Sequence, residues 1–344
     1  MRQKSVRRRL AAVFAVVVAV SGLAVAVASP ALATPGATGA DGEGGSKTLT
    51  EQLDAASRGY LDAKDALAAS TKRQSALAAR LKQIDAEVGP RQAEIDQIGQ
   101  QSYRTGRLGT MSALLTATSP SGFLDRAETL QTIAVKQNDA LRDLKATRTA
   151  QAQAKLAIDA AVRDQQKQLN LMARRKVQAE NALKAANAGQ NASQSTDGGS
   201  SAKATSAPRN SDGSLAAEGC TVNDPTTSGC ITPRMLHAMQ QAQAAGFNHY
   251  VACFRHQNSG EHPKGRACDF AADKGGFGGV ASGASKDYGT RLANYFINNS
   301  DALGVLYVIW FKRIWLPSSG WKAYTRGNGD PSSDHTNHVH LSVR

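Results

Sequence analysis

Four of the seven histidines lie in two short segments of the last third of the chain, together with acidic residues. The first segment separates His262 from Asp269 by six residues, and the second carries His335, His338 and His340 in the spacing His-x-x-His-x-His. Imidazole nitrogens and carboxylates bind zinc well, and a catalytic zinc site uses three protein ligands and keeps a fourth position open. Two ligands from one segment and one from the other predict such a site.

The alternation of residue types indicates how strands would present these side chains. In a strand, alternate side chains share a face. The predicted faces of the second segment are His338, His340 and Ser342 on one side, and Val339, Leu341 and Val343 toward the core. In the first segment, Asp269 would point away from its neighbours Cys268 and Phe270, which frees it to bind a metal.

The first 33 residues have the features of an export signal. A basic start is followed by an apolar run over residues 10–28 and by the small-x-small pattern Ala31-Leu32-Ala33. This order is typical of a secretory signal peptide, cleaved here after Ala33. An uncleaved membrane anchor is the alternative, because about 18 to 20 apolar residues can span a bilayer. Either way, we expect the rest of the chain outside the cytoplasm.

The net charge of +13 is unevenly distributed, and most of the excess outside residues 1–33 lies on residues 47–187. A basic exported protein suits an anionic envelope of wall polymers or lipid headgroups. We expect no nucleic-acid partner, because the chain leaves the cell and lacks an aromatic–basic binding motif.

All four cysteines lie in the last third of the chain, which for an exported domain predicts two disulfides. Three pairings are open, and we favour Cys220–Cys230 and Cys253–Cys268. A cysteine zinc knuckle is the alternative, but no C-x-x-C pair is present.

Residues 47–187 predict a long helical arm, preceded by a Gly-rich segment, residues 34–46, that we expect to be disordered. Apolar residues recur every three or four positions on both sides of a break at residues 119–122. Two similar helices around one break favour an antiparallel coiled-coil hairpin, and Gly89-Pro90 predicts a kink or interruption in the first. A spacer or dimerisation rod and a regulatory arm are both open interpretations.

Residues 188–216 are rich in Gly, Ser, Ala, Asn and Thr and predict a flexible linker. Residues 217–344 then carry all three tryptophans and are long enough for one compact core. We expect a helix over 232–246, capped by Thr232 with Pro233 in its first turn. A second helix over 286–302 and a buried strand over 305–311 complete an α+β domain.

The break in the arm carries Tyr103-Arg104-Thr105-Gly106, then Leu114-Leu115 and Ser119-Pro120-Ser121-Gly122-Phe123-Leu124. With its flanking helices it resembles the coiled-coil N-terminal region of exported peptidoglycan hydrolases of Gram-positive bacteria. In those proteins the arm restrains the catalytic domain or docks on a membrane partner. The resemblance therefore implies a membrane protein as a partner of the arm.

The two histidine segments resemble those of the D-alanyl-D-alanine carboxypeptidase and lysostaphin-type LAS metallopeptidases, which share a fold with the Hedgehog signalling domain. The resemblance covers residues 217–344 and is closest to an actinobacterial-type C-terminal domain. It implies a small antiparallel sheet with helices, Zn²⁺ as cofactor, and His262, Asp269 and His340 as its ligands. It also implies that His338 lies beside the metal, to stabilise an oxyanion or help proton transfer, and that Arg255 holds a substrate carboxylate or backbone.

One position departs from that family. Many relatives carry a carboxylate three residues before the last ligand as the general base, where this chain has Asn337. We assign the base to His335, whose imidazole titrates near neutrality. Asp334 either orients His335 or is itself the base.

Together these features predict an exported zinc metallopeptidase, of the D,D-carboxypeptidase or endopeptidase type, that cleaves peptide bonds in peptidoglycan stem peptides or crosslinks. Its expected location is secreted or cell-wall associated. The alternative is a non-catalytic wall-binding or scaffold protein whose coiled coil recruits a membrane partner.

Overall fold

The computed structural model describes residues 46–187 and 201–344, apart from residue 326. They form a long helical hairpin followed by an α+β domain. The predicted signal peptide, residues 1–33, and residues 34–45 lie outside the described residues. In the described part of the chain, no helix is both long and apolar enough to cross a bilayer.

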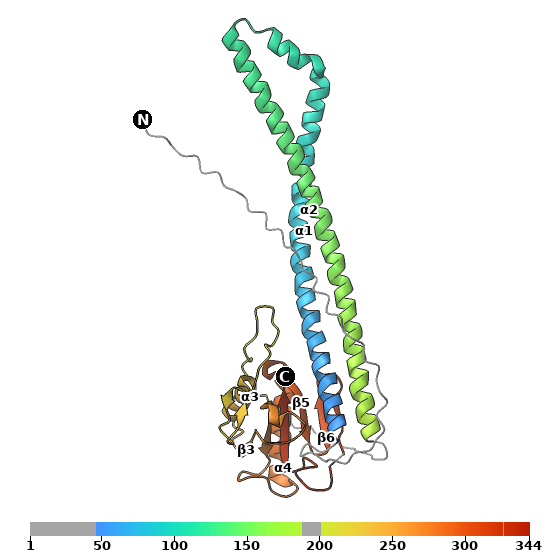
Figure 1. The fold of residues 1–344 in the computed structure, drawn as a ribbon, viewed down its shortest axis with the longest axis vertical. Coiled ribbons are helices and arrows are strands. Elements are labelled where there is room, and N and C mark those ends of the chain that lie inside the picture. The colour runs from blue at the N-terminus through green and yellow to red at the C-terminus, as the bar shows by residue number, and fades with distance from the viewer. Residues whose placement is uncertain (1–45, 188–200, 326) are drawn as a thin grey trace, which may run out of the picture. The chain divides into compact units, whose positions relative to one another are not determined.

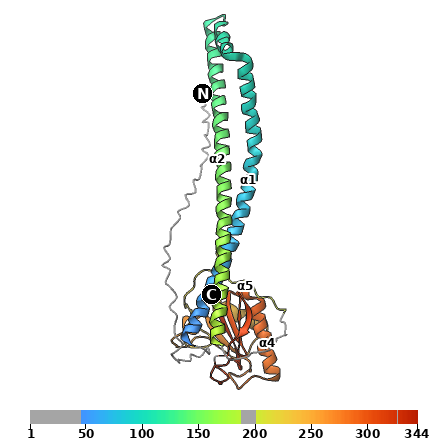
Figure 2. The same ribbon diagram turned by 90° about the vertical axis from the view of Figure 1, so that its right-hand side faces the viewer.

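Helices α1 (Lys47–Leu115) and α2 (Pro120–Ala186) form the hairpin, and Figures 1 and 2 show them side by side over most of their length. Hydrogen bonds between the helices show their relative direction: Gln74 of α1 bonds Gln165 of α2, and Asp85, further along α1, bonds Gln151, which comes earlier in α2. The two helices are therefore antiparallel, as the sequence predicts.

Polar side chains set the beginnings of both helices. The hydroxyls of Ser46 and Ser119 each accept a hydrogen bond from a backbone N–H of the first turn. Pro120 begins α2, at a position where a backbone N–H would have no partner within the helix, so the missing N–H of proline costs no hydrogen bond. Helix α1 is not interrupted at Pro90, contrary to the interruption considered for this position. Its non-helical residue is Gly106, with φ of 63°, which glycine adopts without a Cβ penalty.

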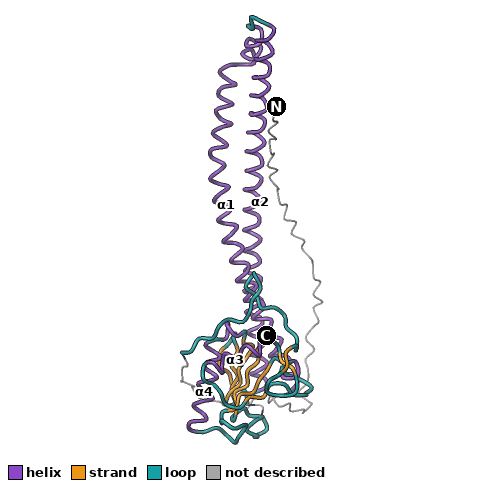
Figure 3. Tube along the Cα trace, turned by 90° about the vertical axis from the view of Figure 1, so that its left-hand side faces the viewer, coloured by secondary structure: helices purple, strands orange, loops and turns teal. Residues whose placement is uncertain are grey.

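The C-terminal domain is built on a six-stranded sheet in the order β3-β4-β8-β5-β6-β7, and all neighbouring strands are antiparallel. The strands are β3 (Val251–Ala252), β4 (Ala267–Ala271), β5 (Val305–Trp310), β6 (Arg313–Leu316), β7 (Gly320–Ala323) and β8 (His338–Val343). A separate two-stranded ribbon pairs β1 (Val222–Asn223) with β2 (Cys230–Ile231). The helices are α3 (Pro233–Ala244), α4 (Gly283–Asn298) and α5 (Ser300–Leu303), with a 3₁₀ turn, η1, at His262–Lys264. Figure 3 shows the strands of the sheet gathered in one group.

One face of this sheet packs against α3 and α4 and forms the main hydrophobic core with them. Val308, Val339 and Leu341 are fully buried there in one cluster with Leu292 and Phe296 of α4. The alternation predicted for β8 is confirmed, because its valines and leucine join this core while His340 and Ser342 bond each other on the opposite face.

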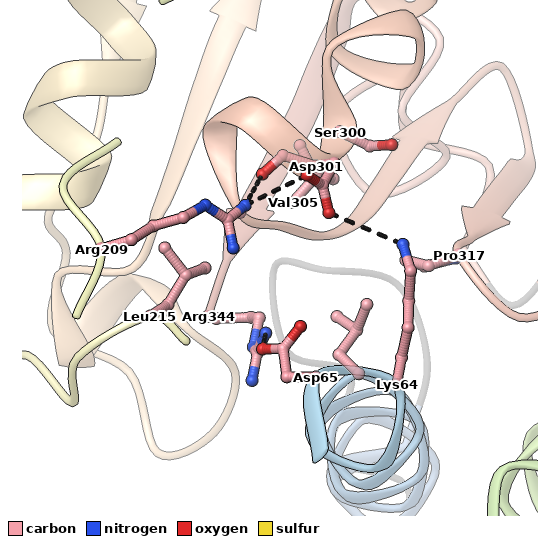
Figure 4. Close-up of a pocket in the computed structure, with 11 residues that line it drawn as sticks. Lys64, Asp65, Arg209, Leu215, Ser300, Asp301, Val305, Pro317 and Arg344 are labelled. Atoms are coloured by element: carbon pink, nitrogen blue, oxygen red, sulfur yellow. Dashed lines mark hydrogen bonds and ion pairs between the residues drawn. The ribbon is translucent and has the colours of Figure 1, made fainter. Parts of the chain in front are cut away.

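The opposite face is partly covered by the base of the arm. Tyr307, Ile309 and Ile314 form a second buried cluster with Leu53 of α1 and Leu183 of α2. The charged rim of this contact pairs side chains of α1 with Arg344, Asp301 and Lys264. Figure 4 shows a pocket at this contact, with Lys64 of α1 reaching Asp301 and Asp65 beside Arg344.

Residues 201–216 belong to the segment predicted as a flexible linker, and they pack along the domain. The backbone N–H of Ala207 bonds the carbonyl of Ala302 at 2.8 Å, and that of Thr205 bonds the side chain of Gln241 in α3 at 2.8 Å. Residues 188–200 of the predicted linker lie outside the described residues.

Two local expectations for the C-terminal domain are confirmed. Thr232 caps α3 and accepts the N–H of Met235, with Pro233 in the first turn. The disulfides pair as favoured, Cys220 with Cys230 and Cys253 with Cys268.

Candidate metal centre

Three buried donor atoms converge on the face of the sheet opposite α3 and α4. His262 Nε2 lies 3.3 Å from His340 Nδ1 and 3.3 Å from Asp269 Oδ1, and the last two atoms are 2.9 Å apart. A tetrahedral zinc with bonds of about 2.0–2.1 Å needs donors about 3.4 Å apart. The three side chains, nearly inaccessible to solvent, therefore fit a zinc ion with an expansion of a few tenths of an ångström.

His262 is aimed by the turn that carries it. Its Nδ1–H donates to the carbonyl of Cys253, so Nε2 carries the lone pair that faces the other two donors. Gly265 ends the turn at φ 67°, and a Cβ there would lie 2.4 Å from Cys220 Sγ and 2.7 Å from the carbonyl of Cys230. This close approach explains why the turn needs glycine.

Asp269 and His340 lie directly opposite each other on β4 and β8. His340 Nε2 lies 2.8 Å from the hydroxyl of Ser342, two residues along the same face, which leaves Nδ1 toward Asp269. Burial raises the pKa of Asp269, but the neighbouring His262, His338 and Arg255 outweigh burial and hold that pKa well below its usual range. The carboxylate is therefore ionised, as a metal ligand must be.

His338 lies beside this group, with its ring fixed by Asn337. The amide of Asn337 donates to the carbonyl of Gly278 and to Ser332 Oγ, both at 2.9 Å, so its carbonyl oxygen accepts from His338 Nδ1 at 2.7 Å. His338 Nε2 has no hydrogen-bond partner among the described residues and lies 3.4 Å from Asp269 Oδ1. The Nε2 atom of His338 is therefore the ring nitrogen that faces the site.

His335 is buried next to the same group, with a ring centroid 4.8 Å from that of His338 and 5.6 Å from that of His340. Neither ring nitrogen has a hydrogen-bond partner in the described part of the chain, and the backbone is held at φ 52°. Burial, followed by His338 and His340, lowers the pKa of His335 well below its usual range, so the ring is neutral near pH 7.

Asp334 does not bond the ring of His335. Its carboxylate lies 2.8 Å from Lys312 Nζ in an ion pair. The orienting role considered for Asp334 thus has no contact to support it among the described residues, and one oxygen of its carboxylate is paired with Lys312.

Arg255 stands at the border between the donors and solvent. One guanidinium nitrogen, Nη1, donates to Asp269 Oδ2, and Nε donates to Gln257 at 2.6 Å. The side chain is 34% exposed, yet the buried Nη2 has no partner among the described residues. A guanidinium with an unused donor beside three candidate ligand atoms is suited to bind a carboxylate or carbonyl oxygen.

An aromatic rim borders His338. The ring of Phe277, 39% exposed, lies 5.3 Å from the ring of His338 and 5.3 Å from that of Tyr250. Exposed apolar side chains at the edge of a buried polar site are typical of a surface that contacts a ligand.

A family model described as VldE, C-terminal domain, matches residues 227–339. No curated protein and no solved structure matches the chain. The family match spans β2 to the first two residues of β8, so it includes His262, Asp269 and His338 and ends before His340.

The structure brings together all the side chains that the sequence proposed for the site, except that Asp334 is turned toward Lys312. Sequence reasoning missed the orienting contacts of Ser342 and Asn337 and the rim residue Phe277. Ser342 had a signal, because it alternates with the histidines of β8. Asn337 was considered only as a missing carboxylate, whereas its amide fixes the ring of His338.

Proposed function

We propose that the C-terminal domain is a zinc-dependent peptidase that acts outside the cytoplasm on the peptide bonds of peptidoglycan, with a fold of the Hedgehog and D,D-peptidase type. The observation that carries the proposal is the approach of His262, Asp269 and His340, whose donor atoms lie 2.9–3.3 Å apart, a few tenths of an ångström short of tetrahedral spacing around zinc. The two disulfides suit an exported protein.

A bound Zn²⁺ would supply the Lewis acid that polarises a scissile carbonyl and lowers the pKa of a nearby water. The chain's own residues would then move the protons. The ring of His335, whose two nitrogens have no hydrogen-bond partner among the described residues, would accept a proton from the attacking water and donate it to the leaving amine. Because Asn337 holds the Nδ1 proton of His338, we assign His338 Nε2 to proton transfer rather than to donating toward an oxyanion.

Recognition of the substrate would fall to Arg255 and the aromatic rim. The unused Nη2 of Arg255 is suited to a substrate carboxylate or carbonyl, and Phe277 and Tyr250 to an apolar side chain near the scissile bond. Peptidoglycan stem peptides offer both kinds of group, and the basic arm favours an anionic wall.

The test uses residues 38–344, which form one compact unit, incubated with purified sacculi. We expect about one bound zinc per chain, as in a mononuclear catalytic site, and release of new amine ends. His262→Ala should lose both. His237→Ala, a histidine of α3 that bonds the carbonyl of Thr205 away from the site, is the matched control and should keep both. Absence of zinc from the unmodified protein would refute the proposal.

A non-catalytic wall-binding protein is the second candidate. It is favoured by the ion pair between Asp334 and Lys312, which occupies the carboxylate that was the other candidate for the general base. Zinc binding and sacculus binding without release of amines would establish this alternative.

We also propose a membrane protein as the partner of the arm. Tyr103, Leu115 and Leu124, near the turn between α1 and α2, are exposed by 90%, 78% and 67%. Changing all three to Ser should abolish crosslinking to membrane proteins on whole cells while leaving zinc binding intact, and unchanged crosslinking would refute this partner.

A further inference from the structure

The base of the arm lies on the same face of the sheet as the metal donors. Ile309 pairs directly with His340 across β5 and β8, and the ring of Tyr307 is stacked on that of His340, with centroids 5.6 Å apart. Tyr307 and Ile309 belong to the buried cluster that Leu49 and Leu53 of α1 complete. The arm therefore packs against the neighbours of a proposed ligand.

A charged contact links the arm to the turn that carries another proposed ligand. Glu261 comes directly before His262 and has no exposed surface. Arg58 of α1 pairs with Glu261 Oε2, and the same guanidinium lies 3.5 Å from the carbonyl of Val343 at the end of β8. One side chain of the arm thus reaches both the turn of His262 and the strand of His340.

Glu261 also organises its own turn. Its backbone carbonyl accepts the N–H groups of Lys264 at 3.2 Å and Arg266 at 3.0 Å. The ammonium of Lys264 and the guanidinium of Arg266 lie 2.8 Å and 3.6 Å from its carboxylate. These two side chains are 48% and 29% exposed, whereas Arg58 is 25% exposed and is the most shielded of the three cations.

A buried carboxylate is stable only while its charge is paired, and removing one partner is costly because the remaining charge stays buried. If Arg58 is lost, Glu261 keeps only Lys264 and Arg266 of these three cations, and we expect its carboxylate to shift toward them and toward water. His262 is the next residue, so a shift of Glu261 should move the imidazole of His262 as well. Such a movement would disturb the contact of His262 Nδ1 with Cys253 and the distance from Nε2 to His340.

We propose that Arg58 and Glu261 form a positioning pair that holds the turn of His262, so that the base of the arm is part of the metal-binding scaffold and not only a tether. The metal identity rests on the function proposed above, but the mechanical link between the arm and the turn does not.

The first measurement is hydrogen–deuterium exchange of the metal-free protein, residues 38–344, in peptides that cover residues 260–268. Arg58→Met and Glu261→Gln should each speed exchange in this turn. Combining the two changes should add little, because both remove the same interaction. Unchanged exchange in Glu261→Gln, a variant that keeps the shape of the side chain, would overturn the proposal even if Arg58→Met fails to fold.

The second measurement is the zinc dissociation constant, determined by competition with a chromogenic chelator. Each variant should bind zinc at least about tenfold more weakly, since loss of an outer partner of a ligand typically costs about 10–100-fold in affinity. Asp65→Asn is the matched control, because Asp65 pairs with Arg344 across the same contact and is 20% exposed. We expect its zinc affinity and its turn exchange to stay within about twofold of the unmodified protein, which is below the range for such partners.

The outcomes separate the two proposals. If the unmodified protein binds no zinc, the proposed function fails, and the exchange measurement still decides the role of the pair. If zinc binds but Arg58→Met matches the unmodified protein, or if Asp65→Asn weakens zinc equally, the pair has no specific positioning role.

Discussion

Replacement of Ser342 by Ala tests how the sheet orients a ligand. The hydroxyl of Ser342 lies 2.8 Å from His340 Nε2, and neither residue has exposed surface. With zinc bound, Nδ1 must offer its lone pair, so the ring proton must sit on Nε2 and needs an acceptor. Without zinc, the proton can sit on Nδ1 and donate to Asp269 Oδ1 at 2.9 Å. The alanine variant therefore weakens the loaded state more than the metal-free state.

The size of this effect follows from two independent arguments. Loss of a hydrogen-bond acceptor from a buried N–H costs up to about 1–3 kcal/mol, which corresponds to about 5- to 150-fold in a binding constant. Loss of an outer partner of a zinc ligand costs about 10–100-fold in affinity. The two ranges overlap at about 10- to 100-fold, so the zinc dissociation constant should rise by that factor, with little change in the melting temperature of the metal-free protein.

The assay is chelator competition on residues 38–344, with Ser70→Ala as control. Ser70 is also fully buried and donates to a backbone carbonyl, that of Ala161 in α2, far along the arm. Its loss should leave zinc affinity unchanged. A Ser342→Ala variant that binds zinc as tightly as the unmodified protein would refute the reasoning that this hydroxyl sets the tautomer of His340.

Three further predictions address other parts of the domain. Phe277→Ala should raise KM about fivefold on a peptide substrate with little change in kcat, because an aromatic contact contributes about 1 kcal/mol; steady-state kinetics would contradict this if KM stayed constant. Asp224→Asn should lower the free energy of unfolding by about 2 kcal/mol near pH 7, because Asp224 accepts N–H groups of Phe254 and Thr226 and two hydroxyls. Burial raises the pKa of Asp224, but these hydrogen bonds outweigh burial and lower the pKa below 3.8. The stabilisation by the ionised carboxylate is therefore present above about pH 4 and is lost as pH falls through the folded-state pKa. Urea unfolding should show that the difference in stability between the unmodified protein and Asp224→Asn shrinks at low pH. Chelation should lower the melting temperature of the unmodified protein, because a ligand at about 1,000 times its dissociation constant contributes about 4 kcal/mol, whereas the melting temperature of His262→Ala should not respond to zinc.

The local parts of the site could be predicted from the sequence because they depend on alternation and spacing. The period of two in β8 separates its histidines from the valines and leucine of the core, and it places Ser342 beside His340. The two disulfides followed from an even cysteine count and loop closure. These features involve neighbours in the chain, whose relative positions the strand geometry fixes.

Contacts between distant parts of the chain gave no such signal. Arg58 and Glu261 are 203 residues apart, and neither stands in a pattern that distinguishes it from other charged residues. The apolar residues of α1 predicted a helix with one buried face, but their periodicity could not show that Leu53 joins a buried cluster with Tyr307 of β5 and does not pack only on α2.

The chemistry of Asn337 shows the same limit on a smaller scale. By residue type, Asn337 replaces the carboxylate that many LAS metallopeptidases carry at this position, which by itself would argue against catalysis. In the structure its amide donates to Gly278 and Ser332, which leaves only its carbonyl to face His338 Nδ1. A carboxylate at this position would lack both donors and would oppose the carbonyl of Gly278. The amide therefore suits a site in which His335 and His338 handle protons, and the missing carboxylate does not by itself favour a non-catalytic protein.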